Sequence, residues 1–86
     1  MKIKKFKKIV YEEHEIDVDS LLKTISQNIR KLRKDRNMNQ EEFAEMLNLS
    51  RPTIVNIESC RQMLTIKNLI IICNSFDVEA VDILGF

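Results

Sequence analysis

The chain has 86 residues, of which 44% are hydrophobic and 31% charged, a balance typical of a globular protein. This length permits one domain with a small core, and one glycine, one proline and no tryptophan argue against a turn-rich sandwich or barrel. We therefore expect an all-α fold. The net charge is only +1, so a positively charged surface could form only where basic residues cluster locally.

Several function classes are disfavoured at once. No apolar run approaches the roughly 20 residues that a membrane span needs, and the basic first residues lack the apolar segment of a signal peptide. Cys60 and Cys73 form no zinc pattern, and His14 is the only histidine, so we expect no metal and no cofactor. No nucleophile–base set or paired acids indicate an enzyme. We expect a cytoplasmic protein with two reduced thiols.

Charge is strongly segregated along the sequence. Residues 2–8 carry five lysines, residues 12–19 carry five carboxylates, and residues 30–36 carry five basic side chains against one acid. DNA-binding proteins need local positive surface rather than a basic total, so this pattern permits DNA binding. A solvated helix face explains the third cluster equally well.

Residues 1–19 form a basic-then-acidic N-terminal extension. One interpretation is an arm with little fixed structure, which could reach along a DNA groove. The other is a strand or helix used for pairing, since Ile16 and Val18 alternate with polar residues as in a short strand.

Residues 20–86 carry the pattern of five helices. The first begins at Ser20, with Ser20 or Asp19 as its cap. Asn39 and Glu42 form a capping-box pair before the second, and the third runs from Ser50 to about Ser59, with the proline tolerated in its first turn. Thr65 caps a fourth, and a short fifth spans 78–84. The expected inner positions are Leu21, Leu22, Ile25, Ile29 and Leu32, then Phe43, Ala44, Leu47, Ile54 and Ile57, then Ile66, Leu69, Ile70, Cys73 and Phe76.

Residues 39–59, "NQEEFAEMLNLSRPTIVNIES", contain two short helices joined by a tight turn. Such a pair, crossing steeply, holds its second helix away from the body of the domain. Arg51, Pro52, Val55 and Asn56 would then face outward, with Thr53 at the margin. A helix held in this way fits the major groove of B-DNA, where Arg and Asn make bidentate contacts to guanine and adenine.

With these residues the chain resembles the lambda-repressor-like helix-turn-helix family over roughly residues 22–84. The resemblance rests on "IRKLRKDRNMNQEEFAEMLNLSRPTIVNIES" and "TIKNLIIICNSFDVEAVDIL". It implies base reading and phosphate contact by residues on the helix-turn-helix, and an ion pair between Arg33 and Glu58. The implied base-reading positions are Ser50, Arg51, Pro52, Val55 and Asn56, and the implied phosphate contacts are Asn39, Ser59 and Arg61. Gln40 is implied to brace the recognition helix and to contact a phosphate or an outer base.

Three departures from the family pattern affect these expectations. The family often has glycine where Asn48 and Cys60 stand, and proline near Leu64. Asparagine tolerates the left-handed backbone, so the first turn should be kept. The loop over residues 59–65 is expected to differ in shape, which weakens the assignment of Arg61. Pro52 can read only DNA shape or a thymine methyl group.

The resemblance implies a sequence-specific regulator of transcription. We expect an autoregulating repressor that binds a palindromic double-stranded operator as a homodimer. The expected dimer interface comprises Val81, Ile83, Leu84 and Phe86. An alternative is an antitoxin that binds a toxin through residues 1–19 and represses its own operon. A third hypothesis, an interaction module that has lost DNA binding, is disfavoured because the polar reading positions are intact.

Overall fold

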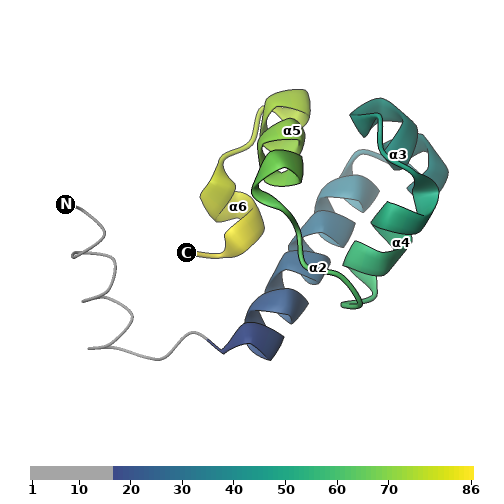
Figure 1. Ribbon diagram of the computed structural model, residues 1–86. Coiled ribbons are helices and arrows are strands. Elements are labelled where there is room, and N and C mark those ends of the chain that lie inside the picture. Colours follow the sequence, from purple (N-terminus) through teal and green to yellow (C-terminus); the bar gives the residue numbers. More distant parts are fainter. Residues whose placement is uncertain (1–16) are drawn as a thin grey trace.

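The computed structural model describes residues 17–86, and this part of the chain forms five helices and no strand (Figure 1). The prediction of an all-α, five-helix domain is therefore confirmed for these residues. The helices are α2 (Val18–Asp35), α3 (Gln40–Leu47), α4 (Arg51–Glu58), α5 (Ile66–Phe76) and α6 (Ala80–Leu84).

The first described helix begins earlier than the sequence indicates. Asp17 is its N-cap, because a carboxylate oxygen of Asp17 accepts hydrogen bonds from the Ser20 backbone N–H at 3.1 Å and the Ser20 hydroxyl at 3.0 Å. The expected cap at Ser20 or Asp19 is wrong, and Val18 belongs to the helix rather than to a short strand. The other expectations for the N-terminal extension concern residues 1–16, which lie outside the described residues.

The helix-turn-helix is formed by local signals. Asn39 caps α3 through a reciprocal capping box with Glu42, with bonds of 2.8 and 2.9 Å. The helix ends at Asn48, whose backbone is left-handed with a φ of 57°. Asparagine adopts this conformation more readily than most residues, so the turn forms without glycine, as expected. Ser50 then caps α4.

The fourth expected helix has the predicted cap but a partly wrong inward face, and the fifth begins later than predicted. Thr65 caps α5, as predicted, through a 3.0 Å bond from the Asn68 N–H. The inward assignment of Ile66 and Ile70 is wrong, since these side chains are 72% and 53% exposed. Ile72, which was not assigned inward, is fully buried. The last helix starts at Ala80 rather than at residue 78.

One core joins all five helices. Its largest fully enclosed side chains are Phe43, Ile29, Ile54, Ile57, Ile72 and Ile83. The α2 helix lies between the other elements and contacts α4 along one side and α6 along another (Figure 1). The rings of Phe43 and Phe76 stack with centroids 5.2 Å apart, and this contact joins α3 to α5. The packing thus fixes α4 relative to the rest of the domain.

Membrane insertion finds no support in the helices over residues 17–86, because none of them combines the length and the apolar character that a bilayer crossing requires.

The turn between α3 and α4 makes a direct test of this account possible. Replacing Asn48 by alanine should lower the free energy of unfolding by about 1 kcal/mol, because a β-carbon without a polar group is disfavoured in the left-handed region. Glycine at this position should match or exceed the wild type. Urea denaturation measures both changes, with Glu45→Ala as a control at an exposed position of α3. Equal stabilities of the alanine and glycine variants would contradict the assigned backbone conformation.

Candidate nucleic-acid interface

The start of α4 is organised by a hydroxyl pair. The Ser50 hydroxyl accepts a hydrogen bond from the Thr53 backbone N–H at 3.2 Å and shares another with the Thr53 hydroxyl at 2.7 Å. Pro52 occupies the first turn, where its missing N–H leaves no helical bond unmade. Arg51 and Pro52 are both exposed. The N-terminal end of this helix is therefore fixed, and its first side chains face solvent.

The starts of α3 and α4 meet at a shallow polar hollow. Asn39, Gln40, Glu41 and Arg51 line it. The exposed backbone N–H groups of a helix start and the guanidinium of Arg51 both favour a negatively charged group. The carboxylate of Glu41 repels a negatively charged group, so it weakens the attraction of such a group to the hollow. The hollow thus brings together three of the residues that the resemblance assigns to DNA.

The end of α4 continues into a closed loop. The backbone carbonyl of Asn56 accepts hydrogen bonds from the backbone N–H groups of Arg61, at 2.9 Å, and Gln62, at 3.2 Å. Cys60 has a left-handed backbone, with a φ of 65°, and its thiol lies 3.3 Å from the Ser26 hydroxyl. Cysteine here takes the conformation that favours glycine, and the expected difference in shape of the loop over residues 59–65 stays a prediction. Arg61 follows Cys60 with an exposed side chain.

A buried carboxylate holds α4 against α2 and α3. Arg33 donates two hydrogen bonds to the two oxygens of Glu58, at 2.7 and 3.0 Å. The side chains of Glu58 and Arg33 are only 2% and 11% exposed. Arg33 also donates to the Met38 carbonyl at 2.9 Å, and Gln40 donates to the same carboxylate at 3.2 Å. Every described buried polar side-chain atom has a partner.

We call the residues assigned to DNA the reading face. Six of them are exposed and four are partly exposed, so none is enclosed in the core. Among them, Gln40 also donates a hydrogen bond to Glu58, which links the reading face to the buried ion pair. The exposed members are Asn39, Ser50, Arg51, Pro52, Ser59 and Arg61, and the partly exposed members are Gln40, Thr53, Val55 and Asn56.

Titratable groups away from the reading face have structural surroundings. Burial raises the pKa of the Cys73 thiol, and the carboxylate of Asp82 raises it further, so this thiol stays protonated at neutral pH. The hydrogen bond to Asp35 raises the pKa of Lys31. Within residues 17–86, histidine, cysteine and acidic side chains nowhere gather in the number needed to hold a metal ion.

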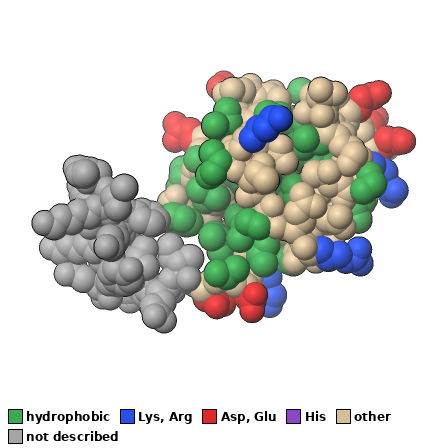
Figure 2. All heavy atoms as spheres, in the orientation of Figure 1, with side chains coloured by type: hydrophobic (Ala, Val, Ile, Leu, Met, Phe, Trp, Pro, Cys, Tyr) green, Lys and Arg blue, Asp and Glu red, His purple; other side chains and the backbone are tan. Residues whose placement is uncertain are grey.

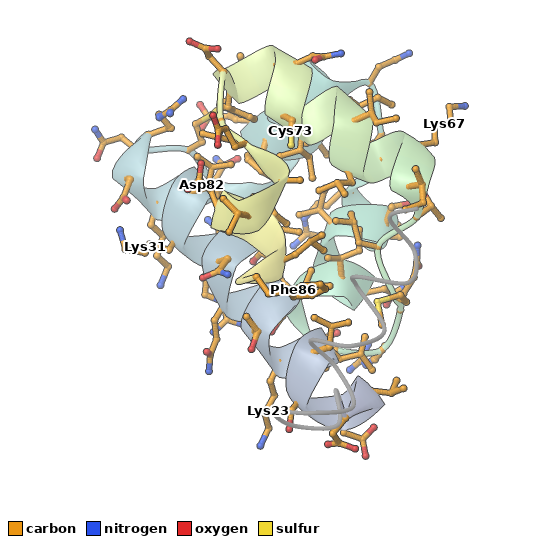
Figure 3. All side chains as sticks on the ribbon, turned by 90° about the vertical axis from the view of Figure 1, so that its left-hand side faces the viewer. Lys23, Lys31, Lys67, Cys73, Asp82 and Phe86 are labelled. Atoms are coloured by element: carbon orange, nitrogen blue, oxygen red, sulfur yellow. The ribbon has the colours of Figure 1, made fainter. Side chains whose placement is uncertain are left out.

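A second surface, the apolar face, lies on α5, α6 and the chain end. Its exposed apolar residues are Ile66, Ile70, Val81 and Phe86. Figure 2 shows hydrophobic side chains gathered on the side of the molecule where α5 and α6 lie, and Figure 3 views that side directly. The assignment of Ile83 to the expected dimer interface is wrong, because its side chain is 1% exposed and belongs to the core. Leu84 is half-buried.

Comparisons with known proteins agree with this geometry. The sequence profile of the helix-turn-helix family matches residues 29–83. The chain is 36% identical over 61 residues to antitoxin PezA of Streptococcus pneumoniae, a match that covers 71% of this chain. It spans only 39% of the length of that curated relative. The chain belongs to the lambda-repressor-like helix-turn-helix family.

Solved structures of this helix-turn-helix family show the same arrangement. The restriction-modification controller protein C.Esp1396I is 37% identical, with a TM-score of 0.65 over 76% of this chain and 83% of its own. A hypothetical transcription factor from Neisseria, NHTF, is 25% identical, with a TM-score of 0.71 over 80% and 79% of the two chains. The controller protein C.AhdI from Aeromonas hydrophila is 22% identical, with a TM-score of 0.67 over 72% and 94%, and it shows the fold alone.

The ion pair allows a prediction about stability. Arg33→Met should lower the free energy of unfolding by about 3–5 kcal/mol, because it leaves the enclosed Glu58 carboxylate without its main partner. The double variant Arg33→Met/Glu58→Leu should recover most of that loss. Chemical denaturation gives the values, and Lys31→Met, which breaks an exposed pair with Asp35, should leave stability nearly unchanged. A double variant no more stable than Arg33→Met would contradict this account.

Proposed function

We propose that this protein is a sequence-specific regulator of transcription that binds a palindromic double-stranded operator as a homodimer and represses its own promoter. The observation that carries the proposal is the reading face, in which α4 is capped at its start by Ser50 and held at its end by Glu58. Membership of a family of DNA-binding regulators supports it. Such a regulator would work in the cytoplasm, without catalysis or a cofactor.

The chemistry of α4 suggests how bases are read. Arg51 can donate two hydrogen bonds to a guanine, and the amide of Asn56 can both donate to and accept from an adenine. Pro52 and Val55 offer apolar contact to a thymine methyl group. Ser50 stands beside these residues at the start of the helix and is also proposed to face the bases. Phosphate contacts position the helix in the groove without reading sequence. The residues proposed to make them are Asn39, Gln40, Ser59 and Arg61.

The dimer is proposed to form through the apolar face. Ile66 and Ile70 are added to the expected residues Val81, Leu84 and Phe86, while Ile83 supports the surface from within the core. Lys67 on α5 and Asp82 on α6 carry unlike charges on this side of the molecule (Figure 3). Unlike charges on one surface suit a second copy of the chain, because a two-fold axis places the same surface of two copies face to face.

An antitoxin function is the second candidate. The similarity to antitoxin PezA favours it, and the chain spans 39% of the length of that protein. A toxin would then bind outside the reading face, for which residues 1–19 are proposed. Co-expression with the product of an adjacent gene discriminates the two functions. Relief of toxicity and a stable complex would support the antitoxin, and their absence would leave the regulator.

The direct test is an electrophoretic shift on the protein's own upstream region, compared with random DNA at near-physiological salt, because affinity for DNA depends steeply on salt. A discrete complex that resists competitor DNA is expected. Equal binding to both DNAs would overturn sequence-specific autoregulation.

Within that assay, Arg51→Ala should weaken operator binding by about 1–3 kcal/mol and relax preference at one base position, because the bidentate contact to a base is lost. Binding to random DNA should change much less. The matched control is Lys31→Ala, which removes a positive charge from the exposed side of α2 (Figure 3). Unchanged operator affinity of the Arg51 variant would remove this residue from base reading.

Dimerisation makes a separate prediction. Ile70→Glu should shift the protein from dimer to monomer in sedimentation experiments, because a carboxylate in the apolar contact would be buried without a partner. The control Met46→Glu changes a side chain of similar exposure, 51% against 53%, on α3. A wild-type protein that sediments as a monomer at all accessible concentrations would contradict the proposed interface.

A further inference from the structure

Each of the last four backbone carbonyls of α4 accepts a hydrogen bond. A helix leaves its last four carbonyls without helical partners. Those of Val55 and Ile57 accept from the backbone N–H groups of Ser59, at 3.0 Å, and Cys60, at 3.2 Å. The Asn56 carbonyl accepts from the loop that follows. Three of the four carbonyls are therefore satisfied by the chain immediately after the helix.

The fourth carbonyl is satisfied from another helix. The Glu58 carbonyl accepts a 2.9 Å hydrogen bond from the Nη2 atom of Arg30, on α2. The Nε atom of Arg30 lies 3.9 Å from the Glu58 carboxylate, a long contact beside the shorter bonds from Arg33. Arg30 thus holds the backbone of Glu58, whereas Arg33 holds its side chain. A positive charge at a helix C-terminus also interacts favourably with the helix dipole.

This anchor lies next to the residues proposed to read bases. Val55 and Asn56 stand in the last turn of α4, within three residues of Glu58. The helix has only eight residues, so a shift at its end displaces a large part of its exposed side. We propose that Arg30 is a positioning residue, which fixes the C-terminal turn of α4 so that Val55 and Asn56 meet the bases in register. This inference rests on the proposed function as a DNA-binding regulator.

The principal alternative for Arg30 is direct contact with a phosphate, since its side chain is 49% exposed. The two roles differ in their dependence on salt. Loss of a phosphate contact weakens binding to all sequences and lowers the salt slope of log K by about one. Loss of a positioning bond weakens binding to the operator, leaves random DNA nearly unaffected and keeps the slope.

The DNA test compares Arg30→Met with Lys34→Met, which removes a charge four residues later on the same helix. For Arg30→Met we expect about a tenfold loss of operator affinity, the size of one hydrogen bond to a charged group, with an unchanged salt slope. Arg30→Lys, which keeps the charge but not the planar donor, should recover only part of the loss. A parallel loss on operator and random DNA with a lower slope, or no loss, would overturn the proposal.

A second measurement is independent of DNA. Amide hydrogen exchange of the free protein should speed up at Ser59, Cys60 and Arg61 in the Arg30→Met variant, with the amides of α5 unchanged. Unchanged exchange at these positions would overturn the proposal even if the protein bound no operator. Faster exchange without operator binding by the wild type would instead refute the proposed function and leave the anchoring role of Arg30 standing.

Discussion

The position of α4 depends on one buried carboxylate. Burying a charge is costly unless the charge is paired and fully hydrogen-bonded, so Glu58 tolerates few arrangements of its neighbours. Arg33 supplies two bonds from α2, and Gln40 supplies one from the start of α3. Any slip of α4 along either helix would break bonds to an enclosed charge. The main effect of the ion pair is therefore to select one orientation of α4, because an apolar contact at this place would permit several.

Four of the five described helices are followed within two residues by a left-handed residue that is not glycine, and only α6 ends at a glycine, Gly85. Asn37, Asn48, Cys60 and Asp77 all have a positive φ within residues 17–86. A left-handed backbone is less favourable for residues with a β-carbon than for glycine, and it is least unfavourable for Asn and Asp. Cys60 lacks the polar side chain that makes this conformation less unfavourable for Asn and Asp, and a thiol forms only a weak hydrogen bond to the Ser26 hydroxyl. These conformations lower the free energy of unfolding, which is already small for a domain of this size. Association of two copies would raise it by mass action.

The helix-turn-helix was predictable from sequence because its signals are local. The caps at Asn39, Ser50 and Thr65 each act within three residues, and the reading face comes from one continuous stretch. The apolar face was not predictable in the same way. Three consecutive isoleucines, residues 70–72, fit more than one helical phase, and only packing against the rest of the core shows that Ile72 points inward and Ile70 outward. The bond from Arg30 to α4 depends on a distant carbonyl, which no local pattern encodes.

The two surfaces are connected by α2. This helix has 18 residues and so is about 27 Å long, and it contacts α4 along one part of its surface and α6 along another. In a symmetric dimer, the separation of two recognition helices must match one turn of DNA, about 34 Å. In the proposed dimer, that separation would be set by the path from the apolar face through α6 and α2 to α4. The buried bonds from α2 to Glu58 would then matter for more than the stability of one domain, because they would fix the last step of that path.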